Sequence, residues 1–154
     1  MDHLLPNALV DKARQVDEAN RRAGRKIAVA ESCTGGLVSA AITEVPGASE
    51  VFYGGFVRYS NEAKTNPLKI GAEVIETFGA VSIGTAWAMA LGALDASGAD
   101  IVVGITGALA PCETTIEACR SLSSAPTRRT GMPILDERMS LAQNHRTLPI
   151  AAAG

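Results

Sequence analysis

The turn at residues 31–36, Glu-Ser-Cys-Thr-Gly-Gly, has residue types that could carry out chemistry. It follows a short apolar run and precedes a stretch with helical spacing, so the sequence predicts a buried strand, a turn and a helix N-terminus. Backbone N–H groups at such a turn can converge on an anion or a developing oxyanion. Ser32 could attack a carbonyl there, while Gly35 and Gly36 would let a substrate approach the backbone. Alternatively, Ser32 and Thr34 only cap the helix, and the glycines only make the turn.

A serine nucleophile needs a base, and histidine does not supply one here. His3 and His145 lie at the two ends of the chain, so a Ser-His-Asp arrangement has little support. Lys64 is the substitute, because a desolvated neutral lysine can accept the serine proton, and Tyr59 could orient it. Tyr59 ends a predicted strand and Lys64 lies in the helix that follows, which brings both to the edge that carries Ser32 if the strands are parallel. The alternative is a solvated Lys64 and a half-buried Tyr59.

Further candidates surround these residues. Thr106 and Gly107 end another predicted strand and could line the same edge, or simply form a strand-end turn. Cys33 is an alternative nucleophile, although an unpaired cysteine is more often a small buried apolar residue. We therefore take as candidate substrate-binding residues Thr34, Gly35, Gly36, Thr106 and Gly107.

The elements that must position these residues can be predicted from periodicity. Helices are expected over residues 4–22, 37–44, 61–68, 72–78 and 82–97, and strands over 26–31, 51–59 and 100–106. In the first helix the apolar residues with helical spacing are Leu5, Leu9, Val16 and Ala19. Gly54 and Gly55 suggest a bulge or a close backbone approach within their strand. Strands that alternate with helices predict a layered α/β domain.

Composition excludes several classes of protein. The chain has 154 residues, 47% of them hydrophobic and 19% charged, which is typical of one globular domain. A net charge of −2 and a pI near 5.7 disfavour nucleic-acid binding. No apolar run reaches the ~18 residues needed to span a membrane, and no basic, apolar leader begins the chain, so we expect a cytoplasmic protein. Three cysteines without zinc-type spacing indicate a reducing compartment and no metal site.

The composition changes near Pro111. All six aromatic residues precede residue 88 and every valine precedes residue 104. Beyond Pro111 prolines interrupt the chain and no strand-like run exists. We therefore expect a folded domain over residues 1–111 and a weakly ordered tail over residues 112–154.

Residues 27–111 resemble the CinA C-terminal domain, the nicotinamide-nucleotide amidohydrolase family. The resemblance rests on five motifs in the family's order and spacing: Ala30-Glu-Ser-Cys-Thr-Gly-Gly-Leu37, Val45-Pro-Gly-Ala-Ser49, Gly55-Phe-Val-Arg-Tyr-Ser-Asn-Glu-Ala-Lys64, Gly79-Ala-Val-Ser82 and Val103-Gly-Ile-Thr-Gly107.

The resemblance implies a three-layer α/β/α sandwich and a role in pyridine nucleotide salvage. The family hydrolyses the carboxamide of nicotinamide mononucleotide to nicotinate mononucleotide and ammonia, without a metal or another cofactor. Carried onto this chain, Ser32 is the nucleophile, Lys64 the general base and Tyr59 its hydrogen-bonding assistant. The partner is then a small-molecule nucleotide, and an exposed sheet edge would also allow a homo-oligomer.

From Leu109 onward the sequence departs from the family, which continues with a glycine-rich loop and Lys-Pro-Val-Gly at the start of another core strand. Residues 116–121, Ile-Glu-Ala-Cys-Arg-Ser, can be encoded as ATC GAA GCC TGT CGG TCN. Reading one nucleotide later gives Ser-Lys-Pro-Val-Gly. We hypothesise a frameshift near codons 110–115, which would leave the sandwich incomplete at its C-terminus.

Two alternative functions follow from these observations. The first is a catalytically inactive, truncated member of the family, which the compositional change suggests. The second is a non-enzymatic nucleotide-binding module, in which residues 32–36 hold a phosphate.

Overall fold

A computed structural model of the chain describes residues 4–65, 68–107, 111–112, 115–116 and 122–124. Five α-helices, one 3-10 helix and six strands lie in these ranges. In chain order they are α1 (Asn7–Arg22), β1 (Ile27–Glu31), α2 (Leu37–Thr43), η1 (Ala48–Glu50), β2 (Phe52–Val57), α3 (Asn61–Thr65), α4 (Ala72–Phe78), α5 (Ile83–Ala96), β3 (Ile101–Thr106), β4 (Pro111–Cys112), β5 (Thr115–Ile116) and β6 (Leu122–Ser124).

The central sheet has the strand order β2-β1-β3-β6. Strand β1 pairs in parallel with both β2 and β3, and β6 runs antiparallel to β3. All five residues of β1 are buried, as expected for the middle strand of a sheet that is covered on both faces. The carboxyl ends of β1, β2 and β3 therefore meet at one edge, as the sequence predicted.

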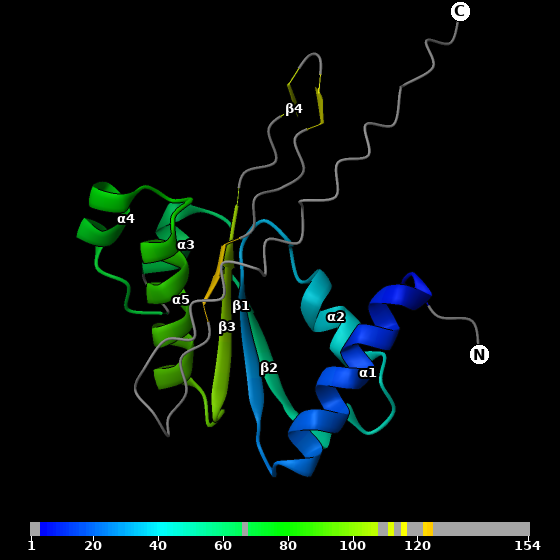
Figure 1. Cartoon of the computed structure of the whole chain (residues 1–154). Helices are drawn as coiled ribbons and strands as arrows, with labels where there is room; N and C mark the ends of the chain where they lie inside the picture. Colours follow the sequence, from blue (N-terminus) through cyan, green and yellow to red (C-terminus); the bar gives the residue numbers. More distant parts are fainter. Residues whose placement is uncertain (1–3, 66–67, 108–110, 113–114, 117–121, 125–154) are drawn as a thin grey trace, which may run out of the picture.

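Helices cover the two faces of the sheet and give the three layers of an α/β/α sandwich (Figure 1). On one face, α1 and α2 pack over a core that includes Val29, Ile42 and Ile105. On the other face, α5 packs over a core that includes Ala28, Ala30 and Met89. Figure 1 shows α3 and α4 on this second side, next to α5. The predicted α/β fold class is confirmed.

Strand β2 contains the irregularity that its glycines predicted. The register shifts after Ile27, which pairs with Phe52, so that Ala28 pairs with Gly54 and Tyr53 is left out of the ladder. A Cβ atom at Gly55 would lie 2.1 Å from Ser39 Oγ, so α2 can approach this strand only because residue 55 has no side chain.

The helices on the α5 side of the sheet begin and end close to the predicted positions. Helix α4 has the predicted bounds, and α5 begins after Ser82, whose hydroxyl accepts a hydrogen bond from the Thr85 backbone N–H as expected of an N-cap. Helix α3 is shorter than predicted and ends at Thr65. Residues 66–67 lie outside the described ranges.

The inward face of α1 differs from the expectation. The buried residues are Val10, Ala13 and Asp17, whereas Val16 is 42% exposed. Apolar spacing missed Asp17 because an aspartate is normally a surface residue. Here Arg21, one turn along α1, pairs with Asp17 at 3.0 Å and neutralises its charge.

The expectation that no strand follows Pro111 is wrong. Leu122–Ser124 forms β6 and pairs with Gly104–Thr106 of β3. Edge pairing satisfies exposed backbone N–H and C=O groups and needs no β-branched side chains, so a search for apolar runs overlooks it. The predicted weak order of residues 112–154 falls mostly outside the described residues and stays a prediction.

Candidate functional site

Ser32 follows directly after the central strand β1, where a buried strand gives way to a turn. Its side chain is only 4% exposed, and its backbone N–H donates a hydrogen bond to the Ile105 carbonyl at 2.9 Å. That bond continues the ladder between β1 and β3 one residue beyond the strand. Two neighbouring strands therefore fix the position of Ser32, which suits a residue that must present one oxygen atom reproducibly.

The carboxylate of Glu31 fixes the turn and the start of α2. Glu31 Oε1 accepts hydrogen bonds from the backbone N–H and the hydroxyl of Ser39, at 2.8 and 2.6 Å. Glu31 Oε2 accepts from the Thr34 hydroxyl at 2.6 Å and from the Val38 backbone N–H at 3.0 Å. One fully buried side chain thus connects β1, the turn and the first turn of α2.

Glu31 is charged although it is buried. Burial alone would raise the pKa of its carboxyl group, but the hydrogen bonds from Ser39, Thr34 and Val38 together lower the pKa below its ordinary value. The alternative in which Ser32 and Thr34 cap α2 does not describe this arrangement, because the Thr34 hydroxyl binds Glu31. The N-cap residue of α2 is Gly36, which has no side chain with which to cap the helix.

The two glycines of the turn adopt a left-handed backbone conformation. Gly35 has a φ of 60° and Gly36 a φ of 100°, a region that residues with a Cβ rarely adopt. Within the described part of the chain, the backbone N–H groups of Thr34 and Gly36 donate no hydrogen bond. They are therefore available to an acceptor at the turn.

Lys64, in α3, is the buried cation at this end of the sheet. Its side chain is only 3% exposed. Burial lowers the pKa of its amine below the ordinary 10.5, and an electrostatic interaction with Cys33 acts in the opposite direction. The Lys64 amine and Cys33, the residue that follows Ser32, therefore interact electrostatically. The alternative of a solvated surface lysine is therefore wrong, because α3 turns this side chain inward.

Tyr59 and Thr106 occupy different environments. Tyr59 follows β2 and is 70% exposed, so its proposed help to Lys64 stays a prediction. Thr106 is fully buried, and its hydroxyl donates to the Ala80 carbonyl at 2.7 Å, which ties the end of β3 to the segment before α5. Gly107 follows at the same edge and is half-buried.

The described residues include no group of three or more His, Cys, Asp or Glu side chains that could hold a metal ion. His3 and His145 lie outside these residues, so their predicted lack of a role is not tested. Across the described ranges, no helix combines the length and apolar character that crossing a bilayer requires.

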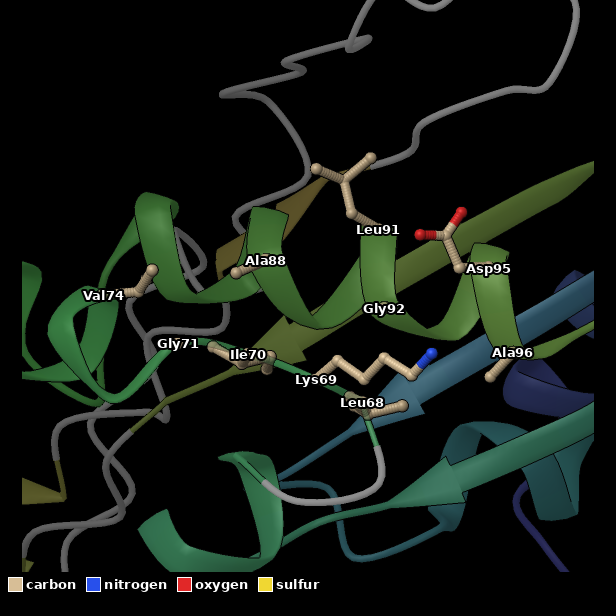
Figure 2. A pocket seen from close by; sticks show the side chains of 10 residues that line it. All are labelled: Leu68, Lys69, Ile70, Gly71, Val74, Ala88, Leu91, Gly92, Asp95 and Ala96. Atoms are coloured by element: carbon tan, nitrogen blue, oxygen red, sulfur yellow. The ribbon is translucent and has the colours of Figure 1, made fainter.

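A pocket of about 280 Å³ lies elsewhere, between α5 and the segment that leads into α4 (Figure 2). It is mainly apolar, and its two charged lining residues are Lys69 and Asp95. None of the predicted site residues lines it. The pocket is therefore separate from the turn after β1.

Sequence reasoning missed the role of Glu31. A signal was present, because a carboxylate at the end of a buried strand must find donors, and the nearest donors along the chain are those of the following helix. The fold and the turn together define a three-layer α/β/α domain with a serine at the end of its central strand.

Comparison with known proteins identifies the family. A family model described as the CinA C-terminal domain matches residues 10–118, and the chain belongs to this family. A competence-damage inducible protein of Caldicellulosiruptor saccharolyticus is 53% identical over 92 residues, which are 60% of this chain and 22% of that protein. The chain thus spans about a fifth of the length of the curated relatives it matches.

Solved structures agree with this assignment. The competence/damage inducible protein CihA from Agrobacterium tumefaciens is 39% identical, with a TM-score of 0.74 over 82% of this chain and 78% of that chain. The competence damage-inducible protein A of Klebsiella pneumoniae is 30% identical, with a TM-score of 0.73 over 81% and 78%.

Proposed function

We propose that this chain hydrolyses the carboxamide of nicotinamide mononucleotide to nicotinate mononucleotide and ammonia, as part of pyridine nucleotide salvage in the cytoplasm. The observation that supports the proposal most is a buried lysine with a lowered pKa, which interacts electrostatically with Cys33, the neighbour of a buried serine at a strand end. An amine in that condition is a better proton acceptor at neutral pH than an exposed lysine. Serine with a lysine base is a known way to cleave an amide.

In the first step, Ser32 Oγ attacks the carboxamide carbon while the neutral Lys64 amine accepts the hydroxyl proton. The carbonyl oxygen becomes an oxyanion, which the backbone N–H groups of Thr34 and Gly36 can stabilise because no acceptor among the described residues uses them. The tetrahedral intermediate collapses when the C–N bond breaks. Lys64 returns its proton to the departing nitrogen, and ammonia leaves.

In the second step, water attacks the ester that joins the nicotinoyl group to Ser32. Lys64, neutral again, takes a proton from this water, and the ester C–O bond breaks. The proton returns to Ser32 Oγ, and the new carboxylic acid loses its remaining proton to water as nicotinate mononucleotide leaves. The enzyme ends in its starting state without a metal or another cofactor.

Ammonia release from nicotinamide mononucleotide by the purified chain, in a coupled assay, tests the proposal. We expect Ser32→Ala and Lys64→Met each to lower kcat/KM by at least about 10³-fold. Lys64→Met keeps an unbranched side chain of similar length, so a buried site should accommodate it. Lys12→Met, at an exposed position on α1, is the matched control and should retain full activity.

Three outcomes would contradict the proposal. Absence of turnover by folded protein would favour the inactive family member. Nucleotide binding that is insensitive to Ser32→Ala, again without turnover, would favour the binding module. Turnover that survives Lys64→Met would exclude Lys64 as the base.

A further inference from the structure

Arg58 directly follows β2, the strand next to β1, at the same end of the sheet as Ser32. Its backbone N–H donates to the Glu31 carbonyl at 2.7 Å and continues the ladder between β1 and β2, in which Glu31 pairs with Val57. Ser32 and Arg58 therefore lie opposite each other, one residue beyond the last pair of the ladder. Neighbouring strands lie ~4.8 Å apart, so their backbones are adjacent.

The alternation of side chains puts Arg58 and Ser32 on the same face. On β1, Ala28 and Ala30 belong to the core under α5, and Ser32 is next in this series. On β2, Phe56 packs against the same core, and Arg58 is next. The helix α3, which carries Lys64, lies on this side of the sheet (Figure 1).

The guanidinium of Arg58 is poorly satisfied by the protein. One terminal nitrogen, Nη1, donates to the Val57 carbonyl at 3.0 Å. The Nε atom is buried and has no hydrogen-bond partner within the described part of the chain. Over the described residues, the ion pairs involve Arg14, Arg21 and Arg22 of α1, and no carboxylate lies within ion-pair distance of Arg58. A permanent positive charge with a spare buried donor thus stands beside the proposed nucleophile.

We propose that Arg58 binds the phosphate group of the nucleotide substrate. This inference rests on the proposed function and names the part of the substrate that the protein recognises away from the reacting amide. A guanidinium binds phosphate through two parallel charge-assisted hydrogen bonds, and the unpartnered Nε can supply one of them. Phosphate fits better than the reacting carboxamide, which is neutral and has the amides of the turn as donors.

Calorimetry with the full chain carrying Ser32→Ala tests this role without turnover. The ligands are nicotinamide mononucleotide and nicotinamide riboside, which differ only in the phosphate. We expect the further substitution Arg58→Met to raise the Kd of the mononucleotide about 10- to 100-fold and to leave that of the riboside unchanged. Arg58→Lys should restore part of the affinity, because it keeps the charge but not the paired donors.

Arg25→Met is the matched control, since Arg25 is exposed and precedes β1 at the opposite edge of the sheet; it should not change either Kd. An equal loss of affinity for the riboside, a change in the mononucleotide Kd of less than threefold, or no binding of the mononucleotide would overturn the inference. Phosphate-dependent binding through Arg58, combined with no ammonia release by the chain that retains Ser32, would support the inference and overturn the proposed reaction.

Discussion

The amine of Lys64 is almost fully removed from water, and such burial disfavours the protonated form of an amine. The folded-state pKa is therefore lower than that of the unfolded chain. Between those two values the unfolded state binds more protons, so the free energy of unfolding rises with pH across this window. The burial that prepares Lys64 to accept a proton therefore also lowers the free energy of unfolding near neutral pH.

We expect Lys64→Met to abolish activity and yet to increase the free energy of unfolding at pH 7. The gain relative to wild type should shrink as the pH approaches 10.5, because the unfolded lysine then loses its proton as well. Urea unfolding of both proteins at several pH values measures it. Lys12→Met serves as the exposed control, and a difference that does not depend on pH would contradict the argument.

Cys33 offers a separate test at the scale of one residue. Its interaction raises the pKa of Lys64, so Cys33→Ala should move the inflection of the pH–kcat/KM profile to lower pH, with kcat on the alkaline side within about threefold of wild type. The profile should rise with pH through an inflection below 10.5 in both proteins. Complete loss of turnover in Cys33→Ala would instead make Cys33 the nucleophile.

At the scale of elements, Glu31 determines how β1 is joined to α2. Its four accepted hydrogen bonds come from three residues of the turn and of α2, so it ties the strand that precedes Ser32 to that helix. Buried carboxylates are costly unless donors surround them, so removing the acceptor leaves several donors unsatisfied.

We predict that Glu31→Gln lowers the free energy of unfolding by about 1–3 kcal/mol, because an amide nitrogen would face donors that need an acceptor. The pKa of Glu31 is depressed in the folded state, so its contribution to stability is present above its ordinary pKa and is lost as the pH falls through the folded pKa. Denaturant unfolding at pH 7 and pH 3 checks this: the variant should differ from wild type mainly at pH 7. The exposed Glu76→Gln on α4 should behave like wild type at both values.

The sequence predicted those elements whose signal is local. The apolar run of β1 and the Ser82 cap depend on residues near one another in the chain, and both were found. The close approach of α2 was marked locally as well, by the Gly54-Gly55 pair. Glu31 and Arg58 were missed as site residues because their environments arise from other elements. Apolar spacing likewise placed Val16 inward, since it cannot detect that Asp17 is neutralised by Arg21.

At the scale of the whole molecule, the described residues pair with only part of the outer edge of β3. Strand β6 pairs with Gly104–Thr106, whereas Ile101–Val103 have no strand partner on that side among the described residues. Unpaired strand edges favour association between chains and contribute little to stability. Under the frameshift hypothesis, the core strand that follows in the family would pair with this part of β3.

The frameshift hypothesis can be tested on the gene itself. Sequencing the coding DNA across codons 100–154 should reveal a one-nucleotide discrepancy that restores Lys-Pro-Val-Gly. A chain expressed in that frame could extend the pairing along β3 and bury more apolar surface, so its Tm should exceed that of the present chain by about 5 °C or more. Circular dichroism melts of the two chains measure the difference. If sequencing confirms the present reading frame, and the present chain unfolds cooperatively at a temperature equal to or above that of the other chain, then Leu122–Ser124 is sufficient to complete the sheet.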